Sequence, residues 1–234
     1  MSEAIFEVLD PGFGLTIQDG GRHGWRRFGV PPSGAMDDHA AAWANRLLDN
    51  PDDAPVLELP LQGVRLRVLN SAWIAVTGAN ACPNIPMWRA IHVQREDIIH
   101  FPRNTSGVWI YLAVAGGFEA ERWLGSASVY PRGLLGRACA SGARLSRRTG
   151  HGNFRLPDHV AGRIAAFAEQ RHYDSPPAIR VWPGPQWDSF LPEERAKFFS
   201  QQWTVTARSD RVGYRLAGEA VHANPIEILS EPVL

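Results

Sequence analysis

Several residue types are scarce in this sequence, and each scarcity narrows the range of possible functions. The 234 residues include only two cysteines, Cys82 and Cys139, which form no CxxC pair and lack the ligand spacing of a zinc site. We therefore expect two reduced, buried thiols. Lys197 is the only lysine, so Schiff-base or phosphate-loop lysine chemistry has a single candidate residue.

Net charge and long apolar runs are also missing. Lys and Arg together number 24, as do Asp and Glu, so no global field exists to attract nucleic acid or an anionic membrane. No apolar run approaches the roughly 20 residues that span a bilayer. The opening MSEAIFEVLDPG lacks the basic and apolar regions of a signal peptide. We predict a cytoplasmic protein that binds neither nucleic acid nor a membrane.

The familiar catalytic signatures are absent too. The sequence contains no GxxxxGK[ST] phosphate loop, no GxSxG nucleophile elbow, no HExxH and no complete GxGxxG. The eight histidines are scattered, without ligand spacing on any one element. We therefore expect no metal ion and no cofactor bound by this chain alone.

Short β-strands dominate what is present. Alternating or continuous apolar runs are separated by Gly, Pro and Asn at intervals of about 8–12 residues, which predicts a sandwich or barrel. The almost unbroken apolar run from Ile110 to Ala115 indicates a central strand that is buried on both faces. Glu58 lies inside another apolar strand, where a carboxylate needs a partner. One helix is predicted over about residues 37–49, because Asp37 can cap it and apolar residues recur at helical spacing.

Composition divides the chain into three parts. We predict an N-terminal β-rich domain over residues 1–145, a connector over 146–177, and the start of a second β domain over 178–234. In the last part we expect strands from Ile179, at Trp203 to Ala207 and at Ile226 to Leu229, with a helix from about Pro192. These elements are too few to close a second barrel, so we predict that the second unit is incomplete.

A first candidate site lies in TIQDGGRHGWRRFGVPPSGAMD, from Thr16 to Asp37. Gln18, Asp19 and Arg22 place an amide, a carboxylate and a guanidinium among several glycines. Successive glycine amides can form an anion-binding nest, and Arg offers a bidentate fork for a carboxylate. The alternative is a buried Asp19–Arg22 pair that holds the loop in shape, with glycines that supply positive φ.

A second candidate site combines GPQ, from Gly184 to Gln186, with SDRVGYRL, from Ser209 to Leu216. Asp210, Arg211 and Tyr214 supply an acid, a cation and a phenol within a few positions. On a strand, alternate residues such as Arg211 and Arg215 share one face. The alternative is a hairpin with surface ion pairs.

Long ordered motifs carry a resemblance to one family. The segment LDPGFGLTIQDGGRHGWRRFGVPPSGAMDDHAAAWANRLLDN, followed by LELPLQGVRLRV, AVTGAN, YLAVAGGF, LGSASVYPRG, VWPGPQ and SDRVGYRL, resembles the KipA family. This family is also called allophanate hydrolase subunit 2. It includes the C subunit of the prokaryotic ATP-dependent 5-oxoprolinase, and its relatives form half of the carboxyltransferase region of urea carboxylase. The usual C-terminal segment of the family, of about seventy residues, is not found after Leu234.

The resemblance implies a fold and partners. It implies a mainly β protein of cyclophilin-like β-barrel architecture with a few short helices. It also implies a complex with two other proteins, one KipI-like and one LamB/YcsF-like, which opens 5-oxoproline, a small carboxylate, to glutamate at the expense of ATP. Two alternatives stay open: a carboxyltransferase component that receives its carboxyl group from biotin on another chain, and a non-catalytic antagonist of a KipI-like kinase inhibitor.

The family motifs also nominate site residues. The candidate catalytic residues are Asp19, Arg22, Asp210 and Arg211. The candidate substrate-binding residues are Gln18, Pro31, Gly34, Met36, Asp37, Gln186 and Tyr214. We hypothesise that Arg22 and Arg211 hold the small carboxylate between the two β units.

Overall fold

A computed structural model describes residues 2–81, 85–148, 162–175 and 178–224. The chain divides into two compact units, Met1–Pro176 and Pro177–Leu234, and each is described by itself. The predicted strand at Ile226 to Leu229 and Cys82 lie outside the described residues. No helix among the described residues is long and apolar enough to cross a membrane.

The first unit contains a four-stranded antiparallel sheet with the order β7-β4-β1-β9. Its strands are β7 (Ile98–Phe101), β4 (Val64–Val68), β1 (Ser2–Pro11) and β9 (Arg144–Arg148). Alternating apolar residues of each strand face one side, and they include Phe6, Leu66 and Phe101, each of which is buried.

A five-stranded antiparallel sheet with the order β2-β3-β8-β5-β6 forms the second layer. Its strands are β2 (Thr16–Gln18), β3 (Val56–Pro60), β8 (Ser106–Val114), β5 (Ala72–Asn80) and β6 (Arg89–Val93). The prediction of a central strand that is buried on both faces is confirmed by β8. Leu112 packs into the core between the sheets, whereas Tyr111 and Ala113 pack on the opposite side.

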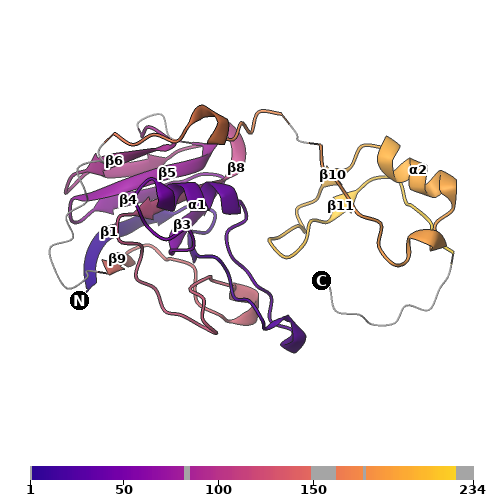
Figure 1. Ribbon diagram of the computed structural model, residues 1–234, viewed down its shortest axis with the longest axis horizontal. Coiled ribbons are helices and arrows are strands. Elements are labelled where there is room, and N and C mark those ends of the chain that lie inside the picture. The colour runs from indigo at the N-terminus through magenta and orange to yellow at the C-terminus, as the bar shows by residue number, and fades with distance from the viewer. Residues whose placement is uncertain (1, 82–84, 149–161, 176–177, 225–234) are drawn as a thin grey trace. The chain divides into compact units, whose positions relative to one another are not determined.

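The two sheets pack against each other around one core, and helix α1 (Asp38–Arg46) covers the outer face of the five-stranded sheet (Figure 1). The mainly β prediction is confirmed. Both strand orders are open, so the barrel-like expectation takes the form of two layered sheets. Burial of each large apolar side chain between these layers contributes about 2 kcal/mol.

Helix α1 confirms the predicted helix and its cap. The Asp37 carboxylate accepts from the amide of Ala40 at 3.0 Å, which satisfies one of the free donors of the first turn. Small residues, Ala40 and Ala44, let the helix approach alanines of the sheet closely, and Leu47 and Leu48 are fully buried behind them.

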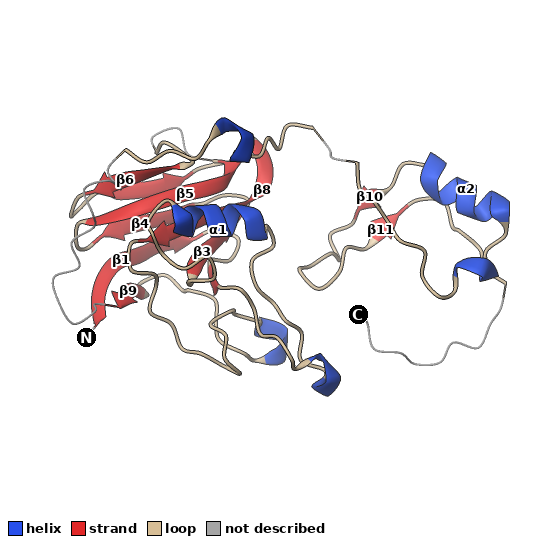
Figure 2. Cartoon of the chain, in the orientation of Figure 1, coloured by secondary structure: helices blue, strands red, loops and turns tan. Residues whose placement is uncertain are grey.

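Three irregular segments of the first unit position the candidate site. We call residues 20–35, between β2 and α1, the first arm, and residues 119–138, between β8 and β9, the second arm. Each carries a short 3-10 helix, η1 (Arg26–Phe28) and η2 (Pro131–Gly133), and both arms extend away from the sheets (Figure 2). We call residues 162–175 the strap; its only helical turn is η4 (Phe167–Glu169).

The second unit contains η5 (Trp187–Ser189), α2 (Pro192–Ser200) and a two-stranded antiparallel pair, β10 (Thr204–Val205) and β11 (Leu216–Ala217). The predicted helix from Pro192 is confirmed. The prediction of a strand from Ile179 is wrong, because no strand is formed over residues 178–186. Pro183 and Pro185 remove two amide donors there, which disfavours strand pairing.

Candidate functional site

The Asp19 carboxylate is held by a buried set of donors. Its Oδ1 accepts from the hydroxyls of Ser126 at 2.5 Å and Ser128 at 2.6 Å, and from the amide of Gly21 at 2.9 Å. Its Oδ2 accepts from the amide of Ala127 at 2.7 Å, and Arg122 lies 3.5 Å away. The carboxylate thus ties the beginning of the first arm to the second arm.

These contacts fix the ionisation of Asp19. Burial by itself raises the pKa of Asp19, but the hydrogen bonds from Ser126, Ser128 and the amides of Ala127 and Gly21 outweigh it, so the pKa is lowered. A carboxylate whose lone pairs are already occupied is a poor general base at neutral pH. The geometry therefore favours a structural role for Asp19, and its catalytic role stays a prediction.

Arg22 completes the same network. It is 1% exposed; its guanidinium donates to the hydroxyl of Ser33 at 3.0 Å and to the carbonyl of Ser128. No carboxylate among the described residues forms a direct ion pair with Arg22, so Ser128 links it to Asp19. Burial lowers the pKa of Arg22, and the nearby charge of Asp19 offsets part of that effect.

The glycines of the first arm distinguish between the two alternatives for this loop, an anion-binding nest and a loop that needs glycine only for positive φ. Gly21 has φ of 87°, and a Cβ there would lie 2.9 Å from the carbonyl of Pro32. Gly34 has φ of 94° and is buried against the backbone of Asp19 and Gly21. The two ends of the arm therefore pack backbone against backbone, which favours the structural alternative at these positions.

A second network surrounds Asp37. Its Oδ2 accepts from the hydroxyl of Tyr173 at 2.6 Å, and its Oδ1 lies 3.4 Å from the guanidinium of Arg171. Its amide donates to the hydroxyl of Tyr111 at 2.7 Å. Asp37 therefore joins the start of α1 to the strap and to β8.

Glu58 contacts this network through Tyr111 and has the hydrogen-bond donors that its burial requires. Its Oε2 accepts from the hydroxyl of Tyr111 at 2.9 Å and from the amide of Met36 at 2.8 Å. Burial, followed by the charge of Glu58, raises the pKa of Tyr111. Burial and the hydrogen bond to Asp37 raise the pKa of Tyr173. Both phenols therefore stay protonated at neutral pH and act as donors.

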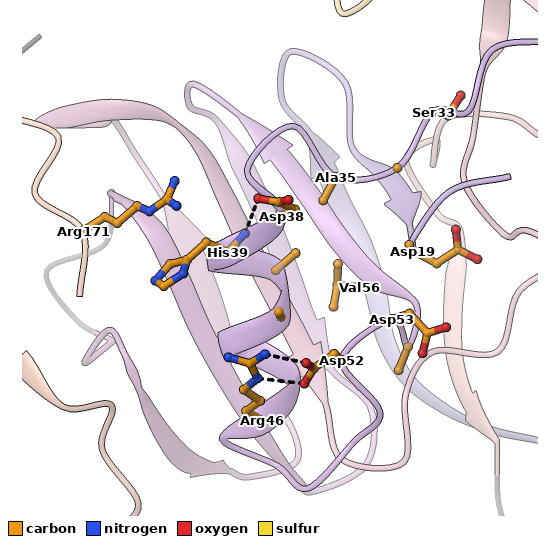
Figure 3. Close-up of a pocket in the computed structure, with 15 residues that line it drawn as sticks. Asp19, Ser33, Ala35, Asp38, His39, Arg46, Asp52, Asp53, Val56 and Arg171 are labelled. Carbon is orange, nitrogen blue, oxygen red and sulfur yellow. Dashed lines mark hydrogen bonds and ion pairs between the residues drawn. The ribbon is translucent and has the colours of Figure 1, made fainter. Parts of the chain in front are cut away.

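A polar cavity of about 600 Å³ opens between the two networks (Figure 3). Its walls come from the ends of the first arm, the outer face of α1, the loop before β3 and the strap. The lining residues with acidic or basic side chains are Asp19, Asp38, His39, Arg46, Asp52, Asp53 and Arg171.

Two of these residues, Arg46 and Asp52, pair with each other. Arg46 donates to Asp52 through Nε at 2.8 Å and through a terminal nitrogen at 2.5 Å, as the dashed lines in Figure 3 show. His39 contacts the carbonyl of Glu169 at 2.7 Å. Arg171 differs from Arg46, because its side chain is 52% exposed and the only ion pair that it forms with the described residues is the 3.4 Å contact to Asp37. Arg171 is therefore the cation best able to receive an anionic ligand in this cavity.

The structure brings together part of the predicted site. Asp19 and Gly34 line the cavity, and Asp37 contacts its lining residue Arg171. Gln18 and Arg22 are buried, Met36 donates its amide to Glu58, and Pro31 lies in the first arm without lining the cavity.

The remaining predicted residues belong to the second unit. Asp210 accepts from the amides of Val212 at 2.9 Å and Gly213 at 3.2 Å, so SDRVGYRL forms a tight turn between β10 and β11. This arrangement matches the hairpin alternative. Gln186, Arg211 and Tyr214 lie in the same unit, and the hypothesis that Arg211 meets Arg22 stays a prediction.

Sequence reasoning missed Arg171, Tyr173, Tyr111 and the two serines. Ser126 and Ser128 lie in the motif LGSASVYPRG, so the motif was a usable signal for them. Their role becomes clear only once their partner, the Asp19 carboxylate, is known. Arg171 and Tyr173 lie in the segment that composition marked as a connector, where weak periodicity gave no signal.

Comparison with known proteins shows to which family this chain belongs. Residues 28–234 match the family described as carboxyltransferase domain, subdomain A and B. The chain belongs to this family. The resemblance to the C subunit of 5-oxoprolinase and to the carboxyltransferase region of urea-degrading enzymes is thereby confirmed.

Relatives and solved structures agree with this assignment. The chain is 31% identical to the 5-oxoprolinase C subunit of Haemophilus influenzae, over 98% of this chain and 74% of the relative. It is 32% identical to urea amidolyase of Saccharomyces cerevisiae, over 91% of this chain but only 12% of that protein. The crystal structure of TTHA0988 superposes with a TM-score of 0.78 at 33% identity, over 93% of this chain and 80% of that chain.

Proposed function

We propose that this protein is the C subunit of an ATP-dependent 5-oxoprolinase. In this proposal it works in the cytoplasm with a KipI-like protein and a LamB/YcsF-like protein. The lactam C–N bond of 5-oxoproline is broken by addition of water to give glutamate, and ATP hydrolysis in the complex supplies the free energy. The chain itself binds no nucleotide in this proposal.

The observation that carries the proposal is the extent of the match. Sequence identity alone does not discriminate, because it is 31% to the 5-oxoprolinase protein and 32% to the urea amidolyase. The chain spans 74% of the former and 12% of the latter. The matched region is therefore most of the 5-oxoprolinase protein and a small part of the urea amidolyase.

The cavity provides a place for a small carboxylate. We assign the substrate carboxylate to Arg171, because Arg46 is already bidentate to Asp52. Asp53 also lines the cavity, and no donor among the described residues pairs with its carboxylate. Asp53 is therefore free to accept a hydrogen bond from the lactam N–H.

Reconstitution tests the function. The full chain is mixed with the purified KipI-like and LamB/YcsF-like proteins of the same organism, and glutamate formation from 5-oxoproline is measured with and without ATP. We expect turnover that requires all three proteins and ATP. Formation of the complex without any glutamate would refute the proposal.

A single substitution tests the assignment of the cavity. We expect Arg171→Ala to raise KM about tenfold or more, because it removes the cation that pairs with the substrate carboxylate. Arg103→Ala, an exposed arginine outside the cavity, serves as the control and should leave KM unchanged. An unchanged KM in Arg171→Ala would move the substrate elsewhere.

The family description favours one second candidate, a biotin-dependent carboxyltransferase component. In that case Arg171 holds the carboxyl group and biotin arrives on another chain. Binding of the chain to a biotinylated carrier protein, with transfer of label from carboxybiotin to urea, would favour this function over the first.

A further inference from the structure

The two arms carry an unusual combination of exposed side chains. Phe28 is 62% exposed in the first arm, and Leu134 is 87% exposed in the second. Trp123 and Leu124 of the second arm are 43% and 40% exposed. Exposed apolar side chains gathered on projecting loops are typical of protein interaction sites.

The arms are also basic. Their exposed arginines are Arg26, Arg27, Arg122, Arg132 and Arg137, against the two acidic residues Glu119 and Glu121. Arg26 and Arg27 have no carboxylate partner among the described residues. The Arg27 guanidinium lies over the ring of Phe28, 4.8 Å from its centroid, and Trp25 packs against the same ring at 5.8 Å. Interface centres are enriched in this combination of arginine and aromatic residues.

The second arm presents its leucines at a conformational cost. Leu134 has φ of 56° and Leu124 has φ of 53°, both in the left-handed region that disfavours residues other than glycine and asparagine. Each lies in a hydrogen-bonded turn: Trp123 pairs with Ser126, and Tyr130 pairs with Leu135. Backbone strain of this kind clusters at functional sites, and covering the exposed leucine side chains with another surface would remove their apolar area from water.

The buried Asp19 network fixes the base of both arms. Asp19 and Arg22, at the start of the first arm, are hydrogen-bonded to Ser126 and Ser128 of the second. The arms therefore extend from one shared base (Figure 2), which these buried hydrogen bonds hold together. Such preorganisation lowers the entropy lost when a partner binds.

We propose that the two arms form a docking surface for an acidic and apolar face of a partner protein, and that Asp19 and Arg22 position it. The identity of the partner as the KipI-like protein rests on the proposed function. Carboxylates of the partner pair with Arg26 and Arg27, and an apolar pocket covers Leu134.

Binding of the full chain to the purified KipI-like protein tests the proposal through charge. We expect the double variant Arg26→Glu, Arg27→Glu to raise Kd about tenfold or more and to weaken the dependence of Kd on salt. Arg103→Glu reverses an exposed charge in the loop between β7 and β8, and its Kd should stay within about twofold of the wild type.

Two substitutions to glycine, at Leu134 and at Leu61, separate the effect on stability from the effect on binding. Leu134→Gly removes the strain and the apolar side chain together, so we expect a higher Tm for the free chain and a Kd raised about fivefold. Leu61 has φ of 60° and is 43% exposed in the turn between β3 and β4. Leu61→Gly should therefore raise Tm in the same way and leave Kd unchanged.

Unchanged binding in both arm variants, or no binding of the wild-type chain to the KipI-like protein, would overturn the proposal. So would binding of a nucleic acid oligomer that depends on Arg26 and Arg27 while binding of the KipI-like protein does not. Failure of the proposed function gives a different result, namely a complex that forms through the arms and produces no glutamate.

Discussion

Two aspartates at opposite ends of the first arm behave differently. Asp19 is enclosed by donors from its own loop and the second arm, with two serine hydroxyls and two backbone amides within 2.9 Å. Asp37 contacts three separate segments: the first turn of α1, the strap through Tyr173 and Arg171, and β8 through Tyr111. The comparison teaches that a carboxylate in a family motif is not thereby a reacting group. Its partners decide which segments of the chain it holds together.

The largest effect is expected from Asp19→Asn. The substitution replaces one acceptor oxygen by an amide group that faces the amide of Ala127, so a buried donor loses its partner. We expect the free energy of unfolding, measured by urea titration, to fall by about 3 kcal/mol. Asp53→Asn, at an exposed position of the cavity, should change it by less than about 0.5 kcal/mol. Lost turnover with intact stability in Asp19→Asn would instead make Asp19 a catalytic residue and end the comparison.

A somewhat smaller effect is expected from Tyr111→Phe, which removes the hydroxyl between Asp37 and Glu58. The amide of Asp37 loses its acceptor and buried Glu58 loses a donor, so stability should fall by about 2 kcal/mol. Tyr173→Phe removes a less buried hydroxyl from the same network and should cost about 1 kcal/mol. A cost near zero for Tyr111→Phe would show that the Asp37 network does not depend on β8.

Asp37→Ala tests the helix cap and should cost about 1 kcal/mol, because the first turn of α1 loses its side-chain acceptor. Asp37→Ser keeps an acceptor for the amide of Ala40 but cannot pair with Arg171. We therefore expect Asp37→Ser to restore most of the stability in thermal unfolding. A Ser variant as unstable as the Ala variant would show that the strap contacts matter more than the cap.

The smallest expected effect concerns pH. The difference in unfolding free energy between wild type and Asp19→Asn should not change over most of the pH range. The pKa of Asp19 in the folded chain is lowered from its ordinary value of 3.8, so its contribution is fully present above that value and is lost as the pH falls through the folded pKa. The difference in unfolding free energy between wild type and Asp19→Asn should thus be constant between pH 7 and about pH 5, and shrink only below about pH 4. A difference that already changes near pH 6 would contradict the lowered pKa.

The sequence predicted the periodic elements well and the site in part. An unbroken apolar run indicated the double burial of β8, and the place of Asp37 before an apolar helical face indicated its cap. Asp19 and Arg22 were recognised together with a structural alternative, a buried pair. The geometry favours a structural role for both residues, but Ser128 links them and no direct Asp19–Arg22 ion pair forms. Arg171 could not be found, because neither its neighbours in the sequence nor any periodicity marks a residue whose partners lie on another element.

The sequence by itself determined most of the described strands, helices α1 and α2, the cap and the family, because each depends on spacing or capping within a few residues or on long ordered motifs. Only the tertiary structure decided which carboxylate is enclosed by donors of the two arms and which joins the start of α1 to the strap and to β8. The contacts that separate Asp19 from Asp37 join residues far apart in the chain: Ser128 lies 109 positions from Asp19, and Tyr173 lies 136 positions from Asp37. Local patterns carry no information about such distant partners, and packing of the sheets, the arms and the strap brings them together.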